Sequence, residues 1–433
     1  MHSITPDDIR RRIAVIADDS MRGRNTPSPE LEEVAAYIAG EFRRFGLRPG
    51  GDDGTYLQRY RLDRVEVVLD SSALWTTGAL EGRWRFGSDA AYYSSEPTEG
   101  EVSGPLLVLT GQISDGVALD SALIAGKIVI LPGGQRQVGG VRRFSQWRPA
   151  AVVFVTTAPD SLWQRYAAQS AGPSLRDPVS EGLRLPPAVL VRDAAARPLF
   201  ARAGLDPDSA RQVRGKPLRA AAIPGVTAHL VVRQRVVDAQ SAPNVIGILE
   251  GSDPRWKGEY LVYSAHMDHV GVGTPVNGDS IYNGADDDAS GTTAVVEAAE
   301  AFALLNPRPR RSILFMAVSG EEHGLWGSAY FAEHPTVPAS DIVADINLDM
   351  VGRNWKDSIA VIGREHSDLG ATLSRVAAAH PELNMQPVDD QWPQENFYYR
   401  SDHYNFARKG VPILFFFNGT HPDYHRPSDS VDK

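Results

Sequence analysis

The chain of 433 residues contains no cysteine and no long apolar run. Without cysteine, disulfide bonds and thiolate metal ligands are excluded, and with them a zinc-finger type of site. The longest apolar run, Val411 to Phe417, has seven residues. A membrane-spanning helix needs roughly 18 such residues, so this run predicts a buried strand and no membrane span. The formal net charge of −10 and the pI near 5.6 argue against a nucleic-acid partner, which would normally meet a basic face.

Composition and length predict a soluble globular protein of more than one domain. The apolar content of 42% and the charged content of 23% are ordinary for such proteins, and the length favours roughly two or three domains. The N-terminus carries no basic-then-apolar signal segment. The C-terminus stops at Lys433 without a closing helix after the last motif, which predicts that the chain is cut short there.

Two segments of different character predict a discontinuous domain with an insertion. Residues 87–235 hold short β-type runs between Gly- and Pro-rich turns and contain no cluster of candidate ligands, which predicts a small β-rich inserted domain. Residues 1–86 and 236–433 would form the enclosing domain. Its first 50 residues predict two helices, one beginning near Pro6 and one running from about Pro29 to Gly46.

The segment after Ala242 alternates strands with helices. Strands are expected at 259–265, 312–318, 342–348, 359–362 and 411–417, and helices at 289–305, 325–334 and 367–379. This alternation predicts an α/β fold, in which a mainly parallel mixed sheet is sandwiched by helices.

Acidic and imidazole side chains follow these strands in five short motifs. The motifs are Ser-Ala-His266-Met-Asp268, Gly284-Ala-Asp286-Asp287-Asp288, Ser-Gly-Glu321-Glu322, Asn347-Leu-Asp349-Met and Asp423-Tyr424-His425. Because a parallel sheet brings the carboxyl ends of its strands together, the five motifs are expected to converge on one crevice. Imidazole and carboxylate without thiolate is a ligand set for zinc, manganese or cobalt. The pattern predicts a metallohydrolase.

The histidines leave alternatives open. His266 and His269 compete in the first motif, and we prefer His266 because in an extended backbone His269 would point away from Asp268. Asp268, two residues after His266, could orient its imidazole. In the last motif His425 is preferred, with His421 as the alternative.

The carboxylates differ in how readily an ordinary structural role accounts for them. One or two of the three residues 286–288 could simply cap a helix, but three exceed what capping needs, and one could bridge two cations. Glu321 and Glu322 point in different directions, so that one can bind metal while the other serves as general base. Asp349 ends a buried-looking strand, where a carboxylate needs a partner.

A charge argument favours two metal ions. The carboxylates of Asp287, Glu322 and Asp349 carry three negative charges, and two neutral imidazoles add none, against four positive charges on two divalent cations. A bridging hydroxide would bring the sum to zero and would be the expected nucleophile.

At these motifs the sequence resembles the co-catalytic di-zinc peptidase family that includes bacterial secreted aminopeptidases, glutamate carboxypeptidase II and the transferrin receptor. By position, the resemblance implies that one zinc ion is held by His266 and Asp349 and the other by Glu322 and His425, with Asp287 bridging. Mn²⁺ or Co²⁺ could replace zinc.

The resemblance also implies the remaining roles. Glu321 matches the general base, Asp268 the carboxylate behind the first histidine, and Tyr424 a residue that hydrogen-bonds the tetrahedral intermediate in some members. The inserted segment resembles the protease-associated domain found in a subset of the family. The implied location is secreted or periplasmic in a bacterium, with a cytoplasmic location left open.

The implied function is release of N-terminal residues from peptides by a two-zinc aminopeptidase. A carboxypeptidase of the same fold is the nearest alternative and would need an arginine facing the cleft to hold the substrate carboxylate, such as Arg353 or Arg400. A glutaminyl cyclase and a non-catalytic receptor-like homologue are further alternatives. The sequence leaves the side-chain preference and the oligomeric state open.

Overall fold

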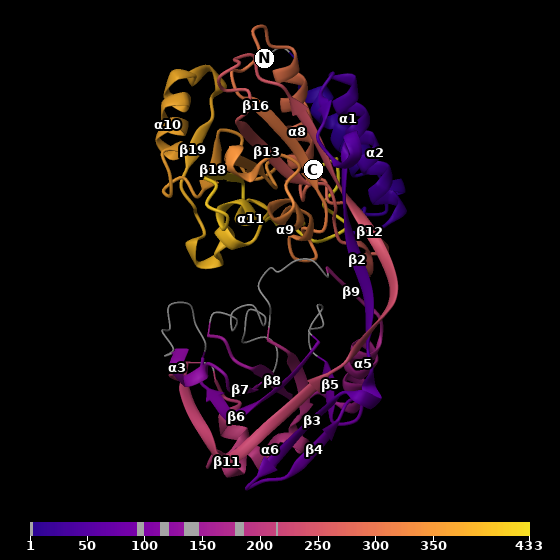
Figure 1. Cartoon of the computed structure of the whole chain (residues 1–433), viewed down its shortest axis with the longest axis vertical. Coiled ribbons are helices and arrows are strands. Elements are labelled where there is room, and N and C mark those ends of the chain that lie inside the picture. The colour runs from indigo at the N-terminus through magenta and orange to yellow at the C-terminus, as the bar shows by residue number, and fades with distance from the viewer. Residues whose placement is uncertain (1–2, 93–98, 113–120, 134–146, 178–185, 214) are drawn as a thin grey trace. The chain divides into compact units, whose positions relative to one another are not determined.

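The computed structural model describes the whole chain except residues 1–2, 93–98, 113–120, 134–146, 178–185 and 214 (Figure 1). It forms two compact units, one made of Met1–Arg61 and Ser241–Lys433, the other of Leu62–Gln240. We call them the ligand-motif unit and the inserted unit. The chain passes from one to the other within the long strands β2 (Leu57–Val67) and β12 (Gln234–Leu249).

The ligand-motif unit is built on a mixed sheet with a parallel centre. Its strands follow the order β19-β18-β20-β17-β13-β16-β12. Neighbours among β20, β17, β13 and β16 run parallel, whereas β18 and β12 are antiparallel to the strands that they flank. The bounds are β13 (Tyr260–His266), β16 (Ser312–Val318), β17 (Ile342–Leu348), β18 (Ser358–Ile362), β19 (Gln386–Val388) and β20 (Ile413–Phe417). The predicted mainly parallel mixed sheet is confirmed.

Helices cover both faces of this sheet. Side chains of β16 alternate between them, because successive residues of a strand point to opposite faces. Phe315 meets the rings of Phe42 and Phe302 on one face, and Met316 packs with Phe331 and others on the opposite face. The helices are α1 (Pro6–Ile16), α2 (Pro29–Arg44), α8 (Ala289–Ala303), α9 (Trp326–Glu333), α10 (Leu369–Ala379) and α11 (His403–Ala407).

The first two helices begin where the sequence predicts. The Thr5 hydroxyl accepts from the backbone N–H of Asp8 at 3.2 Å, and the Ser28 hydroxyl accepts from that of Leu31 at 3.0 Å. A proline follows each cap, where its missing N–H costs nothing and its fixed φ suits the first turn.

Strand register sets the position of the ligand motifs. His266 is the last residue of β13 and pairs in parallel with Val318, the last residue of β16. Glu321 follows β16 by three residues, and Asp349 directly follows β17, the other neighbour of β13. Three adjacent strands therefore deliver their motifs to one edge of the sheet.

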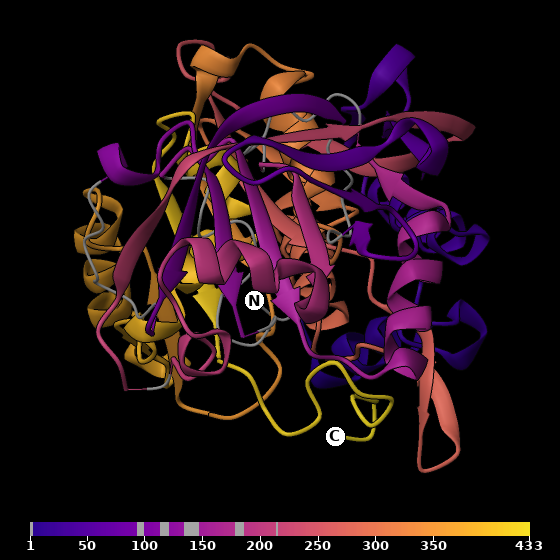
Figure 2. The same cartoon turned by 90° about the horizontal axis from the view of Figure 1, so that it is seen from below.

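The inserted unit has its own core around an eight-stranded sheet. The strand order is β4-β3-β11-β6-β7-β8-β10-β5. Trp163 of α5 (Asp160–Ala171) packs on one face and Phe200 of α6 (Asp193–Arg202) on the other. The magenta strands and the helices beside them can be followed in Figure 2. The bounds are β3 (Ala73–Gly78), β4 (Gly82–Arg85), β5 (Ala90–Tyr92), β6 (Gly100–Thr110), β7 (Ile128–Pro132), β8 (Ala151–Thr156), β10 (Ala188–Arg192) and β11 (Arg219–Val232).

The inserted unit starts earlier in the structure than in the sequence-based division. It runs from Leu62 to Gln240 and not from residue 87 to 235. The reason is pairing: β3 is hydrogen-bonded to β11 and β4 to β3, so residues 73–85 belong to the inserted sheet. Helix α5 was also not predicted.

The smaller elements complete the description. They are β1 (Arg48–Pro49), β9 (Ser174–Arg176), β14 (Gly271–Val276), β15 (Asp279–Tyr282), α3 (Ser121–Ile124) and α7 (Pro207–Ala210). Among the described residues, no helix combines the length and apolar character needed to cross a membrane.

Candidate metal centre

The five predicted ligands lie together at the carboxyl edge of the sheet. His266 Nε2 is 3.3 Å from Asp287 Oδ1 and 3.6 Å from Asp349 Oδ1. His425 Nε2 is 3.1 Å from Asp287 Oδ2 and 3.2 Å from Glu322 Oε2. The two oxygens of Asp287 thus face two separate groups of potential ligand atoms.

The neighbours of Asp287 in the acidic triplet are engaged by the backbone. Asp288 caps α8 by accepting from the N–H of Gly291 at 2.8 Å, and it also accepts from the N–H of Met350 at 3.1 Å. Asp286 Oδ1 accepts from the N–H of Gly352 at 2.7 Å. These contacts give Asp286 and Asp288 structural partners, although Asp288 also offers a carboxylate oxygen within 4.8 Å of ligand atoms of His266 and Asp349.

His421 is separate from the cluster formed by His425. Its Nε2 lies 3.2 Å from Asp286 Oδ2, and this hydrogen bond raises the pKa of His421 against the effect of burial. His425 is the imidazole beside Asp287 and Glu322, as the sequence analysis prefers.

His269 reaches the cluster as well, which the sequence analysis did not expect. Its side chain is buried, and its Nδ1 lies 2.7 Å from Glu322 Oε1 and 3.8 Å from Asp287 Oδ2. The argument against it assumed an extended backbone beyond His266. Strand β13 ends at His266, so the alternation of side chains stops there and both histidines turn toward the carboxylates.

Asp268 holds the loop of the glutamates more closely than it holds an imidazole. Its Oδ2 accepts from the Thr26 hydroxyl at 2.9 Å and its Oδ1 from the N–H of Glu321 at 3.3 Å. The nearest imidazole nitrogen, Nδ1 of His266, is 3.7 Å from Oδ1 and 3.2 Å from the backbone carbonyl of Asp268. The fully buried carboxylate therefore links the first motif to the third.

Arg24 supports the ligand loops and was missed in the sequence. Its guanidinium is fully buried and donates to the carbonyls of Met267 at 2.8 Å and Gly284 at 2.7 Å, and also to that of Asn283. It joins the loop after β13 to the loop that carries Asp287. The only signal in the sequence is a second arginine in a loop between two helices, which does not distinguish it from a surface residue.

The last loop is anchored to the site from its far end. The Asp429 carboxylate accepts from the backbone N–H groups of Asp286 and Asp287 at 3.1 Å. Arg353 donates to Asp423 at 2.9 Å. These contacts fix the segment on either side of His425, whose side chain is 37% exposed.

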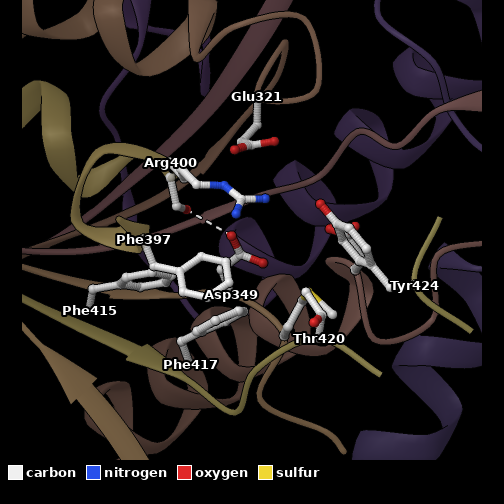
Figure 3. Close-up of a pocket in the computed structure, with 11 residues that line it drawn as sticks. Glu321, Asp349, Phe397, Arg400, Phe415, Phe417, Thr420 and Tyr424 are labelled. Carbon is white, nitrogen blue, oxygen red and sulfur yellow. Dashed lines mark hydrogen bonds between the residues drawn. The ribbon is translucent and has the colours of Figure 1, made fainter. Parts of the chain in front are cut away.

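A pocket opens beside the cluster. Asp287, Glu321, Asp349 and Tyr424 line one part of it. The other part combines the apolar side chains of Met350, Phe397, Phe415 and Phe417 with the polar side chains of Arg400, Ser401 and Thr420. In Figure 3 the side chains of Glu321, Asp349 and Tyr424 point into the same space.

The crowding of acids in the buried cluster shifts the pKa values of its members. Burial and the neighbouring carboxylates Glu322 and Asp349 raise the pKa of Glu321 well above its usual range, with His266 opposing. Burial alone would lower the pKa of His425, but its contacts with Asp287 and Glu322 raise it to about 10.

The residues fit a metal centre by an independent criterion. Asp349 Oδ1 and His269 Nε2 are buried and have no hydrogen-bond partner among the described residues. Buried polar atoms are nearly always paired, so a cluster of unpaired ones points to a missing partner. A cation ligated by these carboxylates and imidazoles would supply it.

The chain is similar to known metallopeptidases over its C-terminal part. Residues 244–433 match the sequence model of peptidase family M28. A protein named "Probable zinc metalloprotease" from Pyrenophora tritici-repentis is 35% identical over 127 residues, which cover 29% of this chain and 25% of that protein. Aminopeptidase YwaD of Bacillus subtilis is 28% identical over 205 residues, covering 45% of this chain and 40% of that protein. The matches thus span less than half the length of these relatives.

A solved structure shares the fold. The aminopeptidase from Aneurinibacillus sp. strain AM-1 aligns with a TM-score of 0.51 and 19% identity, covering 99% of this chain and 88% of that chain. At this identity the likeness concerns the fold alone.

Proposed function

We propose that this protein is a two-zinc aminopeptidase that removes N-terminal residues from peptides, and the match of residues 244–433 to the sequence model of peptidase family M28 supports this. The observation that carries the proposal is the placement of Asp287, whose two carboxylate oxygens face His266 and His425 at 3.3 and 3.1 Å. A carboxylate between two ligand groups is suited to a pair of cations, which in such sites lie about 3.5–4 Å apart.

The proposed ligands are those of the sequence analysis. His266 and Asp349 would hold one ion, Glu322 and His425 the other, and Asp287 both. When bound, two zinc ions would polarise the scissile carbonyl and lower the pKa of a water molecule at the centre toward neutrality. Mn²⁺ or Co²⁺ would serve the same ligand types.

Glu321 is the proposed general base. Its Oε2 lies 4.0 Å from His266 Nε2, farther from that imidazole than the oxygens of Asp287 and Asp349, and it lines the pocket. It would take a proton from the attacking water and deliver it to the leaving amine as the peptide C–N bond breaks.

Tyr424 and Asp268 have supporting roles in the proposal. Tyr424 lines the pocket and its ring stacks on His425 with centroids 3.9 Å apart, so its hydroxyl could donate to the oxyanion of the tetrahedral intermediate. Burial raises the pKa of Tyr424, which keeps the hydroxyl protonated as a donor. Asp268 would hold Glu321 in place through its backbone N–H.

The pocket supports a preference for large apolar N-terminal side chains. Phe397, Phe415, Phe417 and Met350 provide an apolar lining next to the carboxylates of Glu321 and Asp349. A substrate could place its side chain against these rings while its α-ammonium group meets the acids. An apolar pocket discriminates between side chains by about 1–3 kcal/mol per methylene.

The carboxypeptidase alternative depends on a guanidinium that is free to bind a substrate carboxylate. Arg353 is held by Asp423 at 2.9 Å. Arg400 lines the pocket and stacks over the Phe397 ring at 4.5 Å. Arg400 is therefore the residue on which this alternative rests, and the relatives named above do not favour it.

Substrates distinguish the two activities directly. Hydrolysis of leucyl- and phenylalanyl-anilides with a free amine, abolished by a chelator and restored by zinc, is the expected result. Cleavage confined to N-blocked peptides with a free C-terminal carboxylate, and lost in Arg400→Ala, would instead establish the carboxypeptidase.

Two proposals concern the context of the enzyme. The inserted unit, Leu62–Gln240, is proposed to be a protease-associated domain because of its strand-rich composition. Secretion or export to the periplasm is proposed from the family resemblance, and fractionation of the source cells followed by immunoblotting tests it.

A further inference from the structure

A row of buried polar side chains runs beneath the proposed metal centre. Asp345 and Asn347 of β17, and Asp349 just beyond it, share one face of the strand because side chains two residues apart point the same way. Ser264 of β13 is the register partner of Asn347. Asp345, Asn347 and Ser264 are fully buried. Polar groups at the centre of a sheet are costly unless each is hydrogen-bonded.

These side chains form one continuous chain of hydrogen bonds. It starts at Asp349 Oδ2, which lies 2.8 Å from the hydroxyl of Ser401, and this contact is the dashed line in Figure 3. Ser401 Oγ is 3.0 Å from Asn347 Nδ2. Asn347 Oδ1 is 2.9 Å from Ser264 Oγ, and Ser264 Oγ is 2.8 Å from Asp345 Oδ1.

The direction of each hydrogen bond follows from the first. Asp349 as a metal ligand is ionised and can only accept, so the single hydroxyl proton of Ser401 is donated to it. Ser401 then accepts from the amide N–H of Asn347. The amide oxygen of Asn347 accepts in turn from Ser264, whose only hydroxyl proton is thereby used. Nothing remains on Ser264 to donate to Asp345.

We infer that Asp345 is a protonated, neutral carboxylic acid whose O–H donates to Ser264 and so orients the chain that positions Asp349. If Asp345 were ionised, the hydroxyl of Ser264 would face two acceptors with one proton, and one of the two contacts would be unmade. The inference rests on the proposed function, because it takes Asp349 as a metal ligand.

The surroundings of Asp345 agree with a neutral acid. Among the ion pairs of the described residues, none includes Asp345, and an ionised carboxylate without a cation is expensive to bury. The charged group that acts on it is another acid, Asp402, which is hydrogen-bonded to Ser328. Burial raises the pKa of Asp345 to about 8, with Asp402 adding to the effect and Ser264 opposing it.

The consequence for the metal centre is the orientation of Asp349. Ser401 occupies Oδ2, which leaves Oδ1 without a hydrogen-bond partner and 3.6 Å from His266 Nε2. Asp345 touches neither substrate nor metal ligand and acts through three intervening side chains. It is a positioning residue.

A pair of substitutions separates a donor at Asp345 from an acceptor. The amide N–H of Asp345→Asn can still donate to Ser264, whereas Asp345→Leu has similar bulk and no donor. Zinc affinity is measured by chelator competition on the full chain, with Ser264→Ala as a second interruption of the chain. We expect Asp345→Asn to keep the wild-type zinc affinity and both other variants to bind one zinc ion about 10–100-fold more weakly.

The opposite ranking would overturn the inference. If Asp345→Asn loses zinc affinity as strongly as Asp345→Leu, the residue is an ionised acceptor. Should the leucine variant not fold, infrared spectroscopy decides, because the wild type must show a protonated carboxyl band at neutral pH that Asp345→Asn lacks. Neither measurement uses a substrate. Failure of the wild type to bind zinc at all would refute the proposed function, while the infrared band would still test the protonation of Asp345.

Discussion

The substitution Glu321→Gln should separate catalysis from metal binding. Glutamine has nearly the same shape but accepts no proton from water at neutral pH. The proposed ligand atoms lie elsewhere, since His425 contacts Glu322 and Asp287, and Glu321 Oε2 is 4.0 Å from the nearest imidazole nitrogen. General base catalysis contributes about 100- to 10,000-fold to rate, so kcat should fall by that factor, equivalent to about 3–5 kcal/mol of transition-state stabilisation.

The assay is steady-state hydrolysis of a leucyl-anilide, with zinc content measured on the same preparation. Glu321→Gln should keep two zinc ions per chain and a KM close to the wild type. The matched control is Glu322→Gln at the next position, which should lose zinc. A kcat within about tenfold of the wild type, or zinc loss in Glu321→Gln equal to that in Glu322→Gln, would refute the assignment of the base.

Three further predictions concern the supports of the site. Arg24→Ala should lower the free energy of unfolding by at least about 3 kcal/mol in urea, because several buried carbonyls lose their donor; Arg22→Ala, at an exposed arginine two residues away, should change it little, and equal effects would contradict the argument. His269→Phe should lower the binding affinity for one of the two zinc ions about 10–100-fold, measured by chelator competition. Unchanged affinity for both ions would show that the imidazole only fills space. The free energy of unfolding of the wild type, relative to that of Asp345→Asn, should fall as pH rises between about 4 and 8, by at most about 1.4 kcal/mol per pH unit. In this range the carboxyl group of Asp345 is ionised in the unfolded chain but stays protonated in the folded one, because burial raises its pKa to about 8. A difference in urea midpoints that does not change across this range would contradict the prediction.

The fold of the ligand-motif unit could be predicted because its signals are local. Pro6 and Pro29 follow capping residues, and apolar runs between Gly and Pro turns mark the strands. The boundary of the inserted unit could not, because it depends on which strands pair. The run after Ala73 is hydrogen-bonded to β11, some 150 residues later, and no local pattern reports that choice.

In the site, too, the residues with a local sequence signal could be predicted, and those that depend on long-range contacts could not. His266 and Asp349 could be named because each lies at the end of an apolar strand, and Asp287 because three adjacent acids exceed what a helix cap uses. His269 was set aside by a rule for extended backbone that stops applying where β13 ends. Arg24 contributes through hydrogen bonds to four backbone carbonyls that lie far from it in the sequence, and only the folded chain brings these groups together.

A zinc titration of the metal-free protein, monitored by hydrolysis of leucyl-anilide and of its N-acetylated counterpart, tests the central claim most directly. The account predicts that activity appears only with the free amine and reaches its plateau at two zinc ions per chain. A plateau at one zinc ion, or hydrolysis of the acetylated substrate alone, would contradict a two-zinc aminopeptidase.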